Sequence, residues 1–506
     1  MIARTFVAVV VAAALAVSAC TGGDGTASGG DGTASRGDGT ASGGDGTASD
    51  RDCPPEAAVP GVRCLTVTVP LDRENPGQGR VELAVAVIDN DDTVVDSPVV
   101  FLNGGPGGGI VHLAAAFRGF PFDVVAIDLR GSGISEPSLD CPEIDSAFAE
   151  LLSLPAGGSE DDDRYAALLE ECQDRLVAAG VDLDAFDTAA AAADVASVRA
   201  ALGYDEWNLW GSSYGTWVAL AVLRDYPTGV RSVVLDATLP PDVDFLAELP
   251  VNATRAFTEL ASACSADSAC AGRFGDVRTL IRAAADRLAA DPVSVSVVRP
   301  GTGEGVDVLV DAAAFYGVLF DAMYDTSALG RLPLLIERAA DGDLVELVQR
   351  FVDGRDPNTL VFSEALYEAV VCSDDVPFAE PQTVTDGLAG RDPGFIAAFD
   401  TGDFFEDCAA WPLDASEESE DLPVVSDVPT LLVTGRFDPV TPPAWTRRAA
   451  ETLTRSTVVE MPARGHGLAV NDVCSLSIML AFLDEPTAIL DLACVAAADA
   501  VRFVTD

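Results

Sequence analysis

The sequence predicts an α/β protein with a mainly parallel, doubly wound sheet that is interrupted by an inserted helical unit. Two observations carry this prediction. Short apolar runs that end in Gly, Pro or a polar turn alternate with helical patterns, as expected for strands that are buried on both faces. From about residue 241 to residue 410 this alternation gives way to helical runs, which indicates a separate unit over one edge of the sheet.

The composition is that of a globular chain with an extreme charge. The 506 residues are 49% hydrophobic and 22% charged, which allows a large core and an inserted domain. Asp and Glu number 81 against 30 Arg and no Lys, and the formal net charge is −51. Such an acidic surface repels nucleic acid and anionic membranes, so we expect no nucleic-acid partner. We attribute the acidity to solubility or salt adaptation rather than to a basic partner.

The N-terminus predicts export and a lipid anchor. Arg4 precedes the run VAVVVAAALAV, which is too short for an ordinary transmembrane helix and is typical of a signal peptide. The run leads into VSAC, which resembles a bacterial lipobox, so we expect a lipoprotein-type signal over residues 1–20 and lipidation of Cys20. The mature protein would then face outward from the cell membrane and contact it only through the lipid. An ordinary cleaved signal peptide of a secreted protein is the alternative.

Residues 21–52 predict a flexible tether. Four heptapeptide copies, three of GGDGTAS and one of RGDGTAS, fill residues 22–49 and contain no large apolar side chain. A tract of Gly, Ser, Thr and Asp behaves as a flexible linker. It would hold a folded domain close to the membrane.

Cysteine usage also favours export. Setting Cys20 aside leaves ten of the eleven cysteines, an even number that suggests disulfides in an exported chain. The connectivity does not follow from sequence, and we expect local pairing: Cys53–Cys64, Cys141–Cys172, Cys264–Cys270, Cys372–Cys408 and Cys474–Cys494. A metal site is the alternative. The chain has no C-x-x-C pair and only two histidines, so we expect no metal.

The predicted strands can be followed along the chain. RCLTVTVPLD and VELAVAVID, joined by the turn NPGQG, predict an opening antiparallel pair. The later candidates are SPVVFL, FDVVAID, EWNLW, VRSVVLD, PTLLVTG and STVVEM. We therefore divide the chain into a first core part (residues 53–240), a helical cap (residues 241–410) and a second core part (residues 411–506). Ligand sites in such sheets form at the carboxyl edge of the strands, where we place the cap.

The segment NLWGSSYGTW places Ser213 between Gly211 and Gly215. The pattern G-x-S-x-G is weak alone, but here it joins a predicted strand to a helix that begins at Tyr214. Such a strained turn exposes a serine hydroxyl above the sheet. Side chains at the two glycines would collide with the neighbouring strand and helix. We therefore predict that Ser213 is a nucleophile and not merely a turn residue.

A serine hydroxyl needs a base, which is usually a histidine held by a carboxylate. The chain order expected for this arrangement is serine, acid, histidine, which selects His466 in ARGHGL and Asp438 in GRFDPVTPP. We expect Thr441 to cap the helix after Asp438 and Pro442 to begin it.

The loop NGGPGGG, residues 103–109, is expected to stabilise an oxyanion. It follows a predicted strand and carries almost no side chains, so its amides can approach a ligand. We expect the N–H groups of Gly105 and Tyr214 to be the donors. A phosphate-binding loop is the alternative, but the chain has no Gly-Lys-Ser/Thr. We therefore expect no cofactor.

Together, NGGPGG, DLRGSGISEP, GSSYGTW, GRFDPVTP and GHG resemble the serine-peptidase branch of the α/β-hydrolases that contains prolyl aminopeptidases. The resemblance is greatest to the exported actinobacterial tripeptidyl aminopeptidase-like (TAP-like) proteins and covers most of residues 60–500. It implies an α/β-hydrolase fold with a TAP-like C-terminal part, and hydrolysis of peptides from a free N-terminus through an acyl-enzyme. Prolyl aminopeptidases often have His where this chain has Asn103, a departure that touches the support of the loop rather than its amides.

The resemblance also implies that acidic cap residues bind the substrate amine. VVCSDD resembles the family's Cys-x-Asp stretch, so Asp374 is the first candidate, and Glu364 and Glu368 on the preceding helix are weaker ones. In DLRGSGISEP we expect Asp128 and Arg130 to be structural ion-pair partners.

Two other functions stay open at this point. The same machinery hydrolyses esters, so a lipid-anchored carboxylesterase acting on small or lipid esters is the first alternative. A non-catalytic peptide-binding lipoprotein is the second, and the complete set of catalytic residues argues against it.

Overall fold

The computed structural model describes residues 46–505 except 357, 359, 412, 470, 471 and 499. The expected signal peptide, Cys20 and most of the expected tether lie outside the described residues. Within the part of the chain that is described, we find no helix of the length and apolarity needed to cross a membrane.

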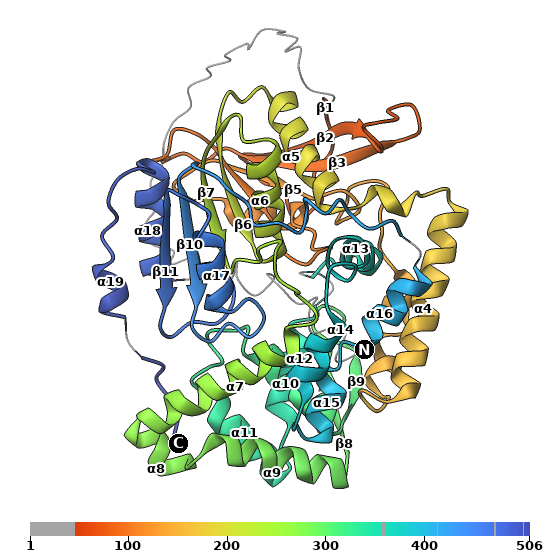
Figure 1. The fold of residues 1–506 in the computed structure, drawn as a ribbon, viewed down its shortest axis with the longest axis vertical. Coiled ribbons are helices and arrows are strands. Elements are labelled where there is room, and N and C mark those ends of the chain that lie inside the picture. Colours follow the sequence, from red (N-terminus) through yellow and green to blue (C-terminus); the bar gives the residue numbers. More distant parts are fainter. Residues whose placement is uncertain are drawn as a thin grey trace.

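A nine-stranded sheet forms the centre of the molecule (Figure 1). The strand order is β1-β2-β3-β5-β4-β6-β7-β10-β11. The strands from β5 to β11 in this order are parallel, whereas β1, β2 and β3 pair antiparallel. The predicted α/β fold, with its opening antiparallel pair, is confirmed. The strands are β1 (Thr47–Asp50), β2 (Val62–Pro70), β3 (Arg80–Ile88), β4 (Val99–Leu102), β5 (Val124–Ile127), β6 (Trp207–Ser212), β7 (Val230–Asp236), β10 (Thr430–Gly435) and β11 (Ser456–Met461).

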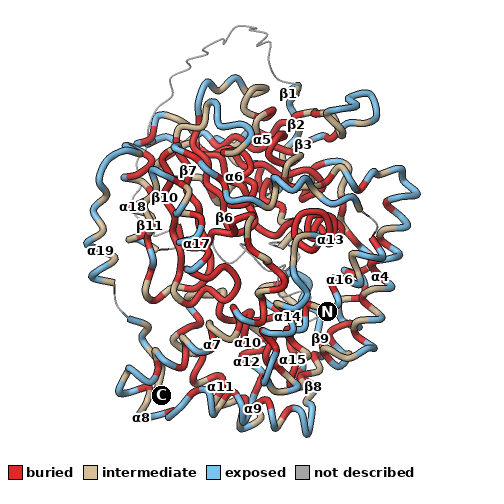
Figure 2. The backbone as a smooth tube through the Cα atoms, viewed as in Figure 1, coloured by how far each residue is buried: buried red, intermediate tan, exposed pale blue. Residues whose placement is uncertain are grey.

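Apolar side chains on both faces of the sheet explain why the central strands are continuous hydrophobic runs. Strands β4, β5, β6 and β10 are buried along their whole length, and Figure 2 shows this buried centre. Helices α5 and α6 pack on one face, and α18 packs with the 3₁₀ segment η2 (Val111–Phe117) on the other. The helices of the core parts are α2 (Pro142–Ser146), α3 (Phe148–Leu152), α4 (Ser159–Ala178), α5 (Thr188–Leu202), α6 (Tyr214–Asp225), α17 (Pro443–Ala450), α18 (Val473–Asp484) and α19 (Ala493–Ala496).

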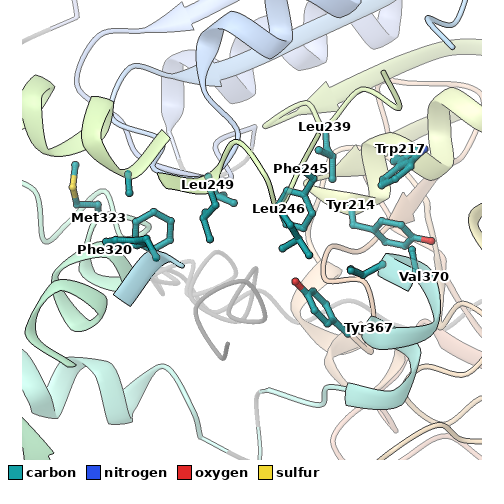
Figure 3. Packing of buried hydrophobic residues seen from close by; sticks show 14 of the residues in the cluster. Tyr214, Trp217, Leu239, Phe245, Leu246, Leu249, Phe320, Met323, Tyr367 and Val370 are labelled. Atoms are coloured by element: carbon teal, nitrogen blue, oxygen red, sulfur yellow. The ribbon is translucent and has the colours of Figure 1, made fainter. Parts of the chain in front are cut away.

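The expected cap contains helices α7–α16 and one antiparallel hairpin, β8–β9. Its side chains share one hydrophobic cluster with the sheet layer, so cap and core form a continuous interior. Figure 3 shows Tyr214 of α6 together with Leu246 and Tyr367 of the cap in this one cluster of buried hydrophobic side chains. The elements are α7 (Leu249–Ala266), α8 (Ser268–Phe274), α9 (Val277–Ala290), β8 (Val293–Val298), β9 (Gly305–Val310), α10 (Ala312–Ala322), α11 (Leu332–Asp341), α12 (Val345–Asp353), α13 (Glu364–Val370), the π-helical turn η4 (Val371–Asp375), α14 (Pro381–Leu388), α15 (Pro393–Phe399) and α16 (Asp403–Ala410).

Two expectations about the domain limits need correction. Residues 47–50 belong to the expected tether, yet they form strand β1 beside β2. They pair because the edge of β2 offers backbone N–H and C=O groups that any extended segment can satisfy, even one with small polar side chains.

Helices α3 and α4 come from the first core part but pack against β9 and α13 of the cap. Figure 1 shows α4 beside α16, away from the sheet.

The structure joins the five cysteine pairs that local pairing predicts. Cys141–Cys172 connects the start of α2 to α4 across a separation of 31 residues. Cys264–Cys270 connects α7 to α8 across only 6 residues. The two bridges therefore constrain unfolded-chain loops of very different length.

Replacing Cys141 and Cys172 by Ala should lower the free energy of unfolding more than replacing Cys264 and Cys270. A bridge restricts the unfolded chain more when its loop is longer, so the expected losses are about 3–4 kcal/mol and about 2 kcal/mol. Urea unfolding followed by tryptophan fluorescence measures both. A larger loss for the short loop would contradict this explanation.

Candidate active site

Ser213 lies in a strained turn between β6 and α6. Its backbone has φ 55° and ψ −124°, which costs a non-glycine residue about 1–3 kcal/mol. Two glycines permit this turn. A Cβ at Gly211 would lie 2.3 Å from the carbonyl oxygen of Gly215, and a Cβ at Gly215 would lie 2.0 Å from that of Leu102 on β4. Any side chain at either glycine would therefore push the strands and the helix apart.

Asp438 holds His466 in one orientation. Asp438 follows β10, His466 follows β11, and Asp438 Oδ2 lies 2.7 Å from His466 Nδ1. The carboxylate is fully buried and also accepts the N–H groups of Val440 and Thr441. Because an ionised carboxylate can only accept, Nδ1 carries the proton and Nε2 is the basic atom. Among the described residues, this buried Nε2 has no hydrogen-bond partner, which suits a group that must take up a proton.

Thr441 supports this pair instead of capping a helix. Its hydroxyl donates to Asp438 Oδ2 at 2.7 Å and lies 3.2 Å from His466 Nδ1. The expected helix start was wrong by one residue, because Pro442 is the N-cap of α17 and Pro443 is its first residue. A hydrogen bond to an ionised acceptor is stronger than a neutral one, which explains why the hydroxyl turns to the carboxylate.

Asp236, at the end of β7, connects the turn of Ser213 to the loop of His466. Its carbonyl oxygen accepts the N–H of Ser213 at 2.9 Å. Its carboxylate accepts the N–H of Leu468 at 2.8 Å and that of Ala469 at 2.7 Å. Burial raises the pKa of Asp236 to about 6, and the amide donors act in the opposite direction. One buried residue thus fixes the serine turn relative to the histidine loop.

The glycine-rich loop after β4 is supported from within. Asn103 Nδ2 donates to the carbonyl oxygen of Gly109 at 3.2 Å. Gly105 has φ +128°, and a Cβ there would lie 2.6 Å from the backbone nitrogen of Gly107, so only glycine fits. Tyr214 is the first residue of α6, and its N–H lies outside the helix's own hydrogen-bond ladder. The N–H groups of Gly105 and Tyr214 therefore remain our candidates for the oxyanion donors.

Asp128 and Arg130 are structural, but they are not partners of each other. The Asp128 carboxylate accepts the N–H groups of Ile110 and Val111, just after the glycine-rich loop. Arg130 binds Asp194 of α5 at 2.8 and 2.7 Å through two donors. The expected ion pair is therefore confirmed for Arg130, which pairs with Asp194. It was wrong for Asp128, which accepts backbone N–H groups instead. A carboxylate buried beside several backbone amides is satisfied without a cation.

The cap reaches both the glycine-rich loop and the histidine loop through backbone hydrogen bonds. The N–H of Gly109 donates to Val361 O at 2.9 Å, and the N–H of Ser363 donates to Gly107 O at 3.1 Å. On the other side, the N–H of His466 donates to the carbonyl oxygen of Tyr324 at 3.2 Å. The rings of Tyr324 and His466 lie 5.1 Å apart.

Asp374, the first candidate for binding a substrate amine, is occupied by the protein itself. Its Oδ2 accepts the N–H of Thr188 at 2.8 Å, and its Oδ1 accepts the hydroxyls of Ser373 and Ser416. Asp374 therefore ties the π-helical turn η4 of the cap to the start of α5. With both oxygens engaged in this way, it becomes the weaker candidate for the amine.

Glu364 and Glu368 lie one turn apart on α13, which begins directly after the contact between Ser363 and the glycine-rich loop. Desolvation, and then the carboxylates of Asp145 and Asp140, raise the pKa of Glu364 well above its usual range. The raised pKa of Glu364 disfavours the anion that an ammonium group attracts.

Glu368 is only 1% exposed and lies next to Tyr367, whose pKa is raised first by burial and then by Glu368. Glu368 therefore remains a candidate for the amine beside Glu364.

The sequence did not indicate the active-site roles of Asp236, Thr441 and Tyr324, although Thr441 was expected as a helix cap. Asp236 had a usable signal, since it ends an apolar strand at the sheet edge where active-site groups gather. Thr441 had a weaker one, its place three residues after Asp438. Tyr324 reaches His466 from the cap, and no local pattern indicates that contact.

The chain is similar to known hydrolases. Residues 97–260 match a family model described as alpha/beta hydrolase fold, and residues 398–494 match one described as TAP-like protein. Over 407 residues the chain is 30% identical to carboxylesterase B of Mycobacterium tuberculosis, which covers 75% of this chain and 76% of that protein. Over 437 residues it is 27% identical to serine protease Hip1 of the same organism, with 78% and 79% covered. Over 210 residues it is 31% identical to tripeptidyl aminopeptidase of Streptomyces lividans, with 38% of each covered.

Asp236→Asn should lower kcat about 10- to 100-fold and change KM little. The amide keeps one acceptor oxygen but turns an NH₂ group toward backbone N–H donors, so the histidine loop shifts relative to Ser213, and small misplacements cost such factors. Ester hydrolysis gives kcat and KM, and circular dichroism reports the fold. Asp375→Asn is the matched control, because Asp375 is another buried acid that accepts two backbone amides, those of Phe245 and Leu246. Equal losses of kcat in both variants would remove the special role of Asp236.

Proposed function

Because the chain belongs to the α/β-hydrolase family with a TAP-like C-terminal domain, we propose that it is an aminopeptidase that removes short peptides from a free N-terminus. Its general class is that of a TAP-like serine hydrolase. The observation that best supports the proposal is the placement of Ser213 in a strained turn that Asp236 connects to the His466 loop, with His466 bonded to Asp438.

The proposed chemistry is acyl transfer. His466 Nε2 takes the proton of the Ser213 hydroxyl, and the serine oxygen attacks the peptide carbonyl carbon. The N–H groups of Gly105 and Tyr214 donate to the oxyanion that forms. His466 then gives the proton to the leaving amine, and a water molecule repeats the sequence to release the peptide and regenerate Ser213. Asp438 keeps the imidazole in the required tautomer throughout.

Peptide specificity is supported by the acidic helix α13. A free N-terminus is an ammonium group, and burying it requires a paired carboxylate. Glu368 is buried four residues beyond Glu364, about 6 Å farther along the helix axis from the segment that contacts the glycine-rich loop. This offset of about one helical turn from the glycine-rich loop suits the binding of a short N-terminal segment. The relatives named as a serine protease and as a tripeptidyl aminopeptidase agree with this class of substrate.

We further propose that the protein is exported and anchored through Cys20. Five disulfides require an oxidising compartment, which supports export. The lipobox-like VSAC and the Gly/Ser/Thr/Asp repeats support a lipid anchor with a tether that ends at β1.

A carboxylesterase is the second candidate, and one observation favours it. The relative that is 30% identical over 407 residues is named carboxylesterase B. Esters do not need an ammonium site, so the acids of α13 distinguish the two proposals.

Hydrolysis of three substrates by the purified domain tests the proposal. They are a tripeptide anilide with a free amine, its N-acetylated form and a short-chain nitrophenyl ester. We expect the free-amine anilide to be cleaved and the acetylated one to be inert, and Ser213→Ala to abolish all turnover while the fold is retained. Fast ester cleavage with two inert anilides would support the esterase instead. Near wild-type activity of Ser213→Ala would remove Ser213 from the mechanism.

Glu368→Gln should raise KM for the free-amine anilide about 30-fold or more and change ester hydrolysis little. Loss of one partner of a buried charge pair costs about 2–5 kcal/mol of binding, which corresponds to at least this factor. Steady-state kinetics with both substrates measures the effect. Asp374→Asn is the matched control, and we expect it to lower the unfolding temperature without a selective rise in KM for the free amine. A selective rise in Asp374→Asn but not in Glu368→Gln would restore Asp374 as the amine ligand.

A further inference from the structure

One face of the cap helix α7 contacts the segment that carries Asp438. Figure 1 shows α7 running below α17 and the strands β10 and β11. We call residues 436–442, between β10 and α17, the acid loop. Three residues of α7 and its N-cap residue contact the acid loop or the start of α17, and their spacing of four, three and four residues places them on one helix face. They are Glu248, Asn252, Arg255 and Glu259.

Glu248 and Glu259, the first and last of these four residues, contact the chain on either side of Asp438. Glu248 Oε2 accepts the indole N–H of Trp445 on α17 at 2.9 Å. Glu259 Oε2 accepts from Arg436 Nε at 2.7 Å, in a pair that is partly exposed to solvent. Exposed pairs of this kind contribute about 0–1 kcal/mol, so the pair of Arg436 and Glu259 alone does not hold the loop firmly.

Arg255 makes the central contact. Its Nη1 donates to the carbonyl oxygen of Arg436 at 2.8 Å, and its Nη2 donates to the carbonyl oxygen of Asp438 itself. A single planar guanidinium thereby holds the backbone on both sides of Phe437. Burial lowers the pKa of Arg255, and the nearby carboxylates of Asp438 and Glu259 act against this change, so the group stays ionised.

This contact completes the set of bonds around the acid. The Asp438 carboxylate is occupied by His466, Thr441 and the N–H of Val440, so its side chain is fully engaged. Its backbone carbonyl is bonded from the cap. A shift of about 1 Å in a catalytic group can lower the rate about 100-fold, so loss of the hydrogen bond to this carbonyl should lower kcat.

We propose that Arg255 of the cap is a positioning residue for the catalytic acid, holding the Asp438 backbone so that its carboxylate stays aligned with His466. The proposal rests on the proposed function in one respect, the use of Asp438 in the triad. It assigns the cap a part in the chemical step and not only in substrate binding. Loss of Arg255 then lowers kcat for every substrate, including an ester that makes no use of the amine site.

Arg255→Ala with added guanidinium tests the proposal. With the nitrophenyl ester we expect kcat to fall about 30- to 100-fold while KM changes by less than about three-fold. Guanidinium ion, at millimolar concentrations far below those that denature, should restore much of the lost kcat by filling the space left by the side chain. Urea at equal concentration should not, and neither should guanidinium added to Ser213→Ala.

Arg273→Ala is the matched control. Arg273 lies on the next cap helix, α8, and pairs with Glu337 at the surface, so its loss should leave kcat unchanged. A kcat of Arg255→Ala within about two-fold of wild type would overturn the proposal. So would a loss of kcat that guanidinium does not restore in a protein with native circular dichroism.

Arg255→Lys decides the question if the alanine variant does not fold. Lysine keeps the positive charge but cannot span both carbonyl oxygens in a fixed plane, so we expect an intermediate kcat and an unchanged KM. A wild-type kcat, or an effect confined to KM, would contradict the proposal. A wild-type protein that cleaves neither the ester nor the peptides would instead refute the proposed function, which keeps the two failures distinct.

Discussion

The backbone of Ser213 imposes the constraint on which the rest of the active site depends. A positive φ at a non-glycine residue is retained only where its surroundings enforce it. Here β4, β6 and α6 approach so closely at Gly211 and Gly215 that no side chain fits at either position. The carbonyl oxygen of Asp236 then fixes the N–H of Ser213 from the neighbouring strand. The strain at the serine is therefore held by the packing of the sheet itself.

The other catalytic loops are held by groups that lie far away in the sequence. Asp236 accepts backbone N–H groups of the histidine loop, and Tyr324 of the cap accepts the N–H of His466. Arg255 fixes the acid loop, and the segment around Ser363 pairs with the glycine-rich loop. Cap and core also share one hydrophobic cluster. The cap is thus part of the framework of the active site, with its contacts made largely to backbone atoms.

Local sequence patterns predicted the strands of the central sheet other than β1, the two glycines around Ser213 and the sequential disulfides, because each depends on neighbouring residues or on chain order. They did not predict the cap hairpin β8–β9. They did not predict the partners that arrive from elsewhere. In the sequence, Asp236 resembles any other polar residue at the end of a strand. Only the sheet order β6-β7-β10 shows that it lies between the strands that lead to Ser213 and to Asp438. Asp374 matches a family motif, yet the hydroxyls of Ser373 and Ser416 occupy its carboxylate. Strand β1 was missed because its pairing is dictated by the open edge of β2 and not by its own small side chains.

Identification of the covalent intermediate tests directly whether Ser213 is the nucleophile. A tripeptide nitrophenyl ester with a free amine can be mixed with the enzyme and quenched in acid within the first turnovers, and the digested protein can be mapped by mass spectrometry. We expect the tripeptidyl group on the fragment that contains Ser213, and its loss on longer incubation before the quench. Continued turnover with no acyl group on Ser213, or an acyl group on another residue, would show that Ser213 is not the nucleophile.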